Sequence, residues 1–121
     1  MVMTMGIMDN VKVSEQEGVI TLELSGDFVE KNFVGIRTMI ENALMGPTPG
    51  FVFIFEKVDF VDSSGVRMLL ELKKLVEGNK RKMILSTLPP PIQTAFERMQ
   101  MENVFNITKT LDKAIERAKA K

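Results

Sequence analysis

The run of five apolar residues from Phe51 to Phe55 constrains the fold of this chain more than any other segment. Because the run shows no polar alternation, it predicts a central strand that is covered on both faces. An amphipathic pattern from Val66 to Glu77 follows and predicts a helix. The sequence Asp-Ser-Ser-Gly at positions 62–65 lies between them, so its hydroxyl groups fall where a strand gives way to a helix.

The rest of the chain also alternates between strand and helix patterns. Strands that alternate with helices over short connections predict an α/β layered domain. We expect a mixed sheet of about five strands with about four helices, in a single domain over residues 11–119 that follows a flexible N-terminal segment of residues 1–10. Strands are predicted at residues 11–14, 19–25, 51–55, 83–85 and 104–108, and helices at residues 30–44, after residue 65, from Pro91 and from Leu111.

Composition excludes several classes of function. The chain has no histidine and no cysteine, which removes Ser-His-Asp catalysis, cysteine nucleophiles, and thiolate and histidine metal ligands. Lys plus Arg and Asp plus Glu balance at 16 each, so nothing favours nucleic acid or an acidic membrane as a partner. No apolar run approaches the ~20 residues that span a bilayer. We expect a cytoplasmic protein without catalytic residues, metal or cofactor.

The junction at residues 62–65 is suited to carry or bind a phosphate group. The first N–H groups of a helix are unpaired and the positive end of its dipole lies there, so a negative group is stabilised. A simpler interpretation is that one of the two serines caps the helix. Asp62 is equally suited to orient the loop as a turn-forming or capping residue. The sequence is consistent with each of these interpretations.

One segment, Val58–Val66, carries a resemblance to a known family. Three further segments support it: Ser25–Phe28, Met83–Leu85 and Met101–Phe105. On these matches the chain resembles the STAS-domain anti-sigma factor antagonists, a bacterial family whose members bind an anti-sigma factor kinase. The resemblance extends from about Val11 to Ala118, almost the whole chain, and it implies the STAS fold.

The resemblance implies a phosphorylation switch at Ser63, with Ser64 in the neighbouring Ser/Thr position. In the family, the unphosphorylated protein binds an anti-sigma factor that is itself a serine kinase, and this releases a sigma factor. Phosphorylation breaks the complex and a phosphatase restores the active form. The expected partners are therefore an anti-sigma factor serine kinase and a phosphoprotein phosphatase, with no nucleic acid and no membrane, and the chain is expected to be a monomer or weak dimer.

Some residues around Ser63 are expected to contact the partner: Asp27, Asp62, Ser64, Gly65, Arg67, Met68 and Leu72. Met68, Leu72 and Leu75 form a second apolar stripe beside the core-facing stripe of their helix. This stripe either packs against a neighbouring helix or is partly exposed, in which case Met68 and Leu72 flank a docking surface.

Two positions depart from the family pattern. Val29 stands where many members have an aspartate, so a contact near Ser63 is either missing or supplied by Asp27 or Glu30. Arg67 replaces a small residue, and it either pairs with a phosphate or faces solvent. The alternative function is a STAS-type ligand-binding or scaffold module of another bacterial signalling complex, without phosphorylation.

Overall fold

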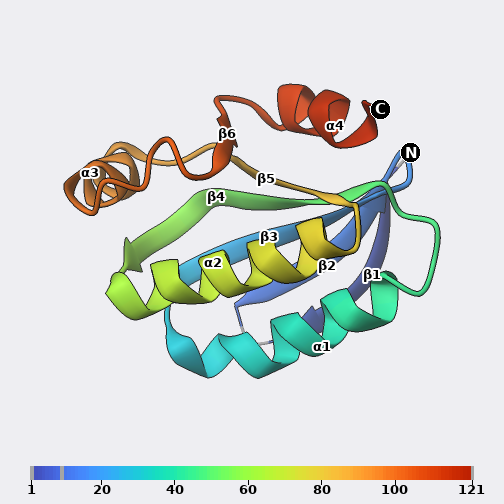
Figure 1. Cartoon of the computed structure of the whole chain (residues 1–121). Coiled ribbons are helices and arrows are strands. Elements are labelled where there is room, and N and C mark those ends of the chain that lie inside the picture. The colour runs from blue at the N-terminus through green and yellow to red at the C-terminus, as the bar shows by residue number, and fades with distance from the viewer. Residues whose placement is uncertain (1, 9, 121) are drawn as a thin grey trace.

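Six strands form one mixed sheet in the computed structural model, which describes residues 2–8 and 10–120. The strands are β1 (Val2–Met8), β2 (Val11–Gln16), β3 (Val19–Phe28), β4 (Gly50–Val61), β5 (Lys82–Ser86) and β6 (Asn106–Thr108). They are neighbours in the order in which they follow one another along the chain (Figure 1). The first three strands pair antiparallel, and β3 through β6 pair parallel.

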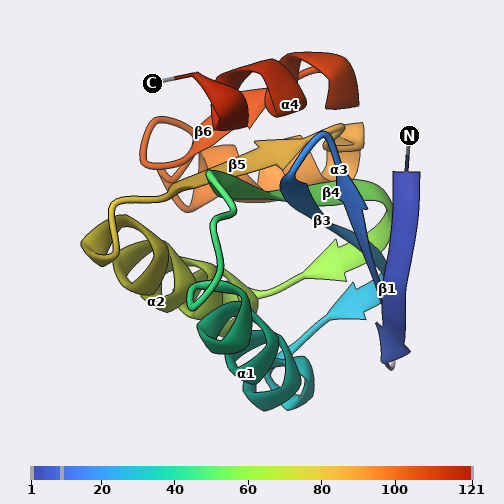
Figure 2. The same cartoon turned by 90° about the vertical axis from the view of Figure 1, so that its right-hand side faces the viewer.

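Helices cover both faces of this sheet. They are η1 (Glu30–Asn32, a 3₁₀ turn), α1 (Phe33–Ala43), α2 (Ser63–Gly78), α3 (Pro90–Arg98) and α4 (Leu111–Lys119). Helices α1 and α2 lie side by side on one face, and α4 lies on the other (Figure 2). Helix α3 packs against β4, where the rings of Phe96 and Phe55 meet edge to face at 6.2 Å. The predicted mixed α/β fold with four helices is confirmed.

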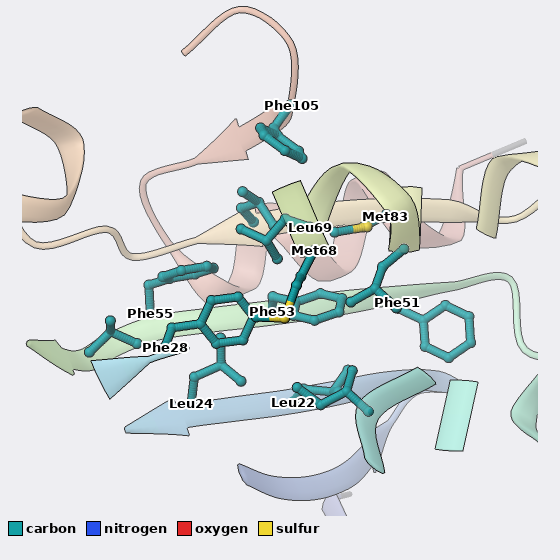
Figure 3. Packing of buried hydrophobic residues seen from close by; sticks show 14 of the residues in the cluster. Leu22, Leu24, Phe28, Phe51, Phe53, Phe55, Met68, Leu69, Met83 and Phe105 are labelled. Atoms are coloured by element: carbon teal, nitrogen blue, oxygen red, sulfur yellow. The ribbon is translucent and has the colours of Figure 1, made fainter. Parts of the chain in front are cut away.

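Strand β4 is buried on both faces, as its apolar sequence predicts. Phe51, Phe53 and Phe55 point into the larger core cluster with α1 and α2 (Figure 3). Val52 and Ile54 point into the smaller cluster with α4. Burying apolar side chains on both faces contributes roughly 25 cal/mol for each Å² removed from water. The strand is thereby fixed as the centre of the domain, and it delivers its C-terminal end to a defined position.

The sheet has one strand more than the sequence analysis expected. We expected residues 1–10 to form a flexible segment outside the domain, but Val2–Met8 pairs with β2 as the edge strand β1. Strand pairing depends on backbone N–H and C=O groups, which every non-proline residue carries, so a weak side-chain pattern does not prevent it. The expectation of a flexible segment outside the domain therefore does not hold for Val2–Met8. Residues 1 and 9 of that segment lie outside the described part of the chain.

The last strand is shorter than its sequence pattern predicts. A strand was expected from Val104, but β6 begins at Asn106. Phe105 turns into the core, where its ring meets that of Phe96 at 5.7 Å, while Val104 faces solvent. Packing of one aromatic ring therefore replaces strand pairing at these two residues.

Candidate functional site

The candidate site lies where the parallel strands β3 and β4 end side by side. Phe28 and Val61 are aligned partners at the ends of the two strands, and Asp27 is aligned with Phe60. Each strand leads directly into a helical segment, η1 after β3 and α2 after β4. The structure thus brings Asp27 to the same edge of the sheet as residues 62–65.

Asp62 is the N-cap residue of α2. It has extended backbone angles, and its Oδ1 atom accepts a hydrogen bond of 2.8 Å from the backbone N–H of Gly65. The same oxygen accepts a hydrogen bond of 2.7 Å from the hydroxyl of Ser64. The interpretation of a serine as the cap is therefore wrong, and the capping interpretation of Asp62 is confirmed.

These hydrogen bonds also set the charge of Asp62. The N–H of Gly65, followed by the hydroxyl of Ser64, stabilises the ionised carboxylate and lowers the pKa of Asp62 below its ordinary value. Asp62 is therefore negatively charged at neutral pH, beside the positive end of the helix dipole. Any charged group that is added next to Asp62 therefore interacts with a carboxylate that is already ionised.

The two serines differ in what their hydroxyls do. Ser64 is partly buried and donates its proton to Asp62. Ser63 is exposed, and its side chain makes no hydrogen bond within the described part of the chain. The hydroxyl of Ser63 is therefore the one that an incoming group can reach without breaking an internal contact.

Gly65 is needed for packing. A Cβ atom at this position would lie 2.6 Å from the carbonyl oxygen of Phe28 and 3.1 Å from a methyl group of Val61. Only a residue without a side chain lets the first turn of α2 approach the end of β3 this closely. Gly65 is buried, so its expected role as a partner contact is replaced by this packing role.

Met68 and Leu72 do not form an exposed stripe. Their exposed fractions are 6% and 0%, and both belong to the core cluster. Figure 3 shows Met68 directed into this cluster toward Phe53. Helix α2 contacts both the sheet and α1, and the two apolar stripes of α2 contribute to one core cluster. The expectation that these two residues flank a docking surface is wrong.

Asp27 and Arg67 are exposed at this edge, which leaves both side chains accessible to a partner. Val29 is half-buried and precedes η1, and it provides no side-chain cap. Glu30 is exposed in the first turn of η1 and offers a carboxylate in its place.

Sequence reasoning missed Phe60, whose side chain is 50% exposed two residues before Asp62. It borders a hollow of about 220 Å³ between the end of β4 and α3, with Asp59, Pro91, Thr94 and Arg98 among the residues around it. The signal in the sequence was an aromatic residue beyond the buried run, near the C-terminal end of β4. An exposed aromatic residue at this edge of the sheet suits protein contact.

No group of three or more Asp, Glu, His or Cys side chains in residues 2–8 and 10–120 is placed to hold a metal ion. No helix in the same residues has the length and apolar character that crossing a membrane requires.

Comparison with solved structures shows the same fold in proteins of different function. The anti-sigma factor antagonist SpoIIAA is 23% identical with a TM-score of 0.72, covering 88% of this chain and 94% of its own. An anti-sigma factor antagonist from Mycobacterium paratuberculosis is 17% identical with a TM-score of 0.74, covering 99% and 96%. A sulfate transporter family protein from Wolinella succinogenes is 21% identical with a TM-score of 0.67, covering 86% and 87%. At these identities the likeness shows the fold alone.

The family itself is shown by the sequence. The family model of the STAS domain matches residues 10–114, which include β2 through β6 and the junction at Asp62. Because this match covers most of the chain, the chain belongs to the STAS domain family.

Proposed function

We propose that this chain is an anti-sigma factor antagonist that is switched by phosphorylation of Ser63. The unphosphorylated form binds an anti-sigma factor serine kinase and releases a sigma factor, and a phosphatase reverses the modification. One observation carries this proposal: Ser63 offers an exposed hydroxyl at the start of α2, while the adjacent Ser64 is engaged by Asp62. The chain is then a substrate for the kinase, and it needs no catalytic residues of its own.

The switch follows from charge. A phosphate on Ser63 adds about −1.5 to −2 charges at neutral pH. It lies next to the ionised Asp62, so a partner surface that fits a neutral hydroxyl has to desolvate a cluster of negative charge. No rearrangement of the core is required, because Ser63 is exposed. Solved relatives support the idea, since SpoIIAA is described in both an unphosphorylated and a phosphorylated form.

The proposal is tested by incubating the chain with its candidate anti-sigma kinase and ATP and mapping the modified residue by mass spectrometry. Modification is expected at Ser63 and is lost in Ser63→Ala. Ser64→Ala is the matched control, because it removes a neighbouring hydroxyl and should keep the modification. Phosphate on Ser64 in the wild-type chain, or on neither serine, contradicts the proposal.

Binding of the kinase tests the electrostatic mechanism separately. Ser63→Asp places a charge where the phosphate would lie, and we expect the Kd for the kinase to rise at least tenfold, because a buried unpaired charge costs several kcal/mol. Ser63→Asn, of similar size and without charge, is the control. Equal weakening by both variants would mean that shape, and not charge, drives release.

A hollow of about 610 Å³ favours the second candidate function, a ligand-binding module. It lies between α3 and β6, with apolar Leu88, Phe96 and Ile107 and polar Gln93 and Lys109 among its lining residues. Its size and mixed lining are typical of small-molecule sites. This candidate makes the opposite prediction at the junction, namely that Ser63→Ala leaves the activity of the signalling complex unchanged.

A further inference from the structure

We propose that Arg67 forms an ion pair within α2 with the phosphate on Ser63. The inference rests on the proposed function, because it concerns the phosphorylated form. It makes the exposed Arg67 a specific part of the switch in this chain.

The helix places the two side chains together. Ser63 and Arg67 are four residues apart in α2, and both are exposed. Residues at this spacing lie on one face of a helix with Cβ atoms about 5–6 Å apart. An arginine side chain readily spans this distance, and its planar guanidinium group matches phosphate oxygens with two parallel hydrogen bonds.

The charges around Arg67 favour this pairing over the alternative. Within the residues that the structure describes, no carboxylate lies within 4 Å of the guanidinium of Arg67, whereas the nearby Lys73 is paired with Glu77 at 3.0 Å. Glu71 is also four residues from Arg67, but on its C-terminal side. An ion pair on a helix is more favourable when the acid precedes the base, as with Ser63 and Arg67. A phosphate also carries more charge than a carboxylate.

The consequence is a two-part switch. In the unphosphorylated protein the guanidinium of Arg67 is available to carboxylates of a partner. Phosphorylation adds a negative group to this face and at the same time engages the only exposed cation in the first two turns of α2 that the structure describes. The partner thus loses an attractive contact as well as meeting a repulsive one.

The test uses full-length chains with phosphoserine incorporated directly at position 63, compared with the same chains carrying serine. The variants are Arg67→Gln and, as a matched control, Lys74→Gln. Lys74 is an exposed cation of the same helix, three turns and about 16 Å beyond Ser63 on nearly the same face. Both variants therefore remove one charge from α2, but only the first removes it within reach of the phosphate.

Two readouts decide the outcome. Phosphorylation should raise the Tm of wild type and Lys74→Gln by about 2 °C more than that of Arg67→Gln, a difference that 0.5 M salt should reduce. By ³¹P NMR, the second pKa of the phosphate should be about 0.3 lower in the first two proteins than in Arg67→Gln. Equal values for the two variants overturn the proposal. Because the phosphate is installed without a kinase, failure here is distinct from failure of the kinase to modify Ser63.

Discussion

The two ends of β4 use their polar groups in opposite ways. In the loop that leads into β4 the polar groups bond internally: the hydroxyl oxygen of Thr48 lies 3.0 Å from the carbonyl oxygens of both Gly18 and Gly50, which share its single proton. The guanidinium of Arg81 donates to the carbonyl of Thr48 at 2.9 Å and to that of Gly46 at 2.7 Å. The turn that leaves β4 is closed by one carboxylate and leaves the hydroxyl of Ser63 free. The end of β4 that carries the candidate site is therefore distinguished by an available polar group and not by looser packing.

Packing is equally tight at both ends. A Cβ atom at Gly50 would lie 2.7 Å from the carbonyl oxygen of Lys82, and one at Gly65 would lie 2.6 Å from that of Phe28. In both places the close approach is to backbone, which cannot rotate away. The comparison can therefore be tested by perturbing packing and polar groups separately.

The largest expected effect is from Gly65→Ala. The new methyl group must displace the end of β3, and we expect a loss of about 2–4 kcal/mol in the free energy of unfolding, measured by urea denaturation. Gly78→Ala is the matched control in the same helix, because no atom lies within 4 Å of the Cβ position there. Should the two variants be equally stable, the close approach of α2 to β3 is wrong.

Arg81→Ala should have the next largest effect. It removes the guanidinium that bonds the carbonyls of Leu44, Gly46 and Thr48, and we expect a loss of about 2 kcal/mol by the same measurement. Modification of Ser63 by the kinase should be unchanged, since the two groups lie at opposite ends of β4. If the variant is as stable as wild type, or is no longer modified, the proposed division between a structural end and a binding end of β4 is wrong.

Asp62→Ala should cost about 1 kcal/mol, the usual value for loss of a helix cap. The pKa of Asp62 is lowered in the folded state, so its stabilising effect is present above the pKa of the unfolded chain, about 3.9, and is lost as pH falls through the folded pKa. Asp62→Asn keeps a cap without titrating. On acidification from pH 7 to pH 2.5, thermal melts should show wild type losing stability relative to Asp62→Asn; parallel melting curves would count against the cap.

The smallest expected effect is that of Ser63→Ala on stability. An exposed side chain without an internal hydrogen bond contributes little, and the change should stay within about 0.5 kcal/mol. Ser64→Ala should cost about 0.5–1.5 kcal/mol, because it removes the hydrogen bond to Asp62. The reverse order in calorimetry would falsify the assignment of the free hydroxyl to Ser63.

Local patterns predicted the fold well because burial acts on each element separately. The apolar run of β4 predicted a strand buried on both faces, and the helical spacing in α2 predicted a helix with a core-facing side. Both predictions are confirmed. Strand β1 was missed because its pairing is made by backbone groups and leaves little trace in side-chain pattern.

The site was predicted in position but not in detail. The order of residues placed Ser63 at the start of a helix, yet it could not tell which neighbour supplies the cap. Met68 and Leu72 were assigned to a surface because the sequence does not show how much of the apolar surface of α2 the core covers. Phe60 was not predicted as a site residue because its exposure depends on the tertiary packing around the end of β4. These three features depend on how the elements pack against one another, which the local sequence pattern does not show.

The exposure of Phe60 offers a way to observe the proposed binding directly. The chain contains no tryptophan and no tyrosine, so its own fluorescence is almost dark. A single tryptophan in Phe60→Trp would occupy a half-exposed aromatic position two residues from Asp62. Its emission would shift to shorter wavelength when a partner excludes water from this surface. Because the native chain contributes almost no emission of its own, the signal of this tryptophan would report partner binding, and its reversal by phosphorylation of Ser63, in real time.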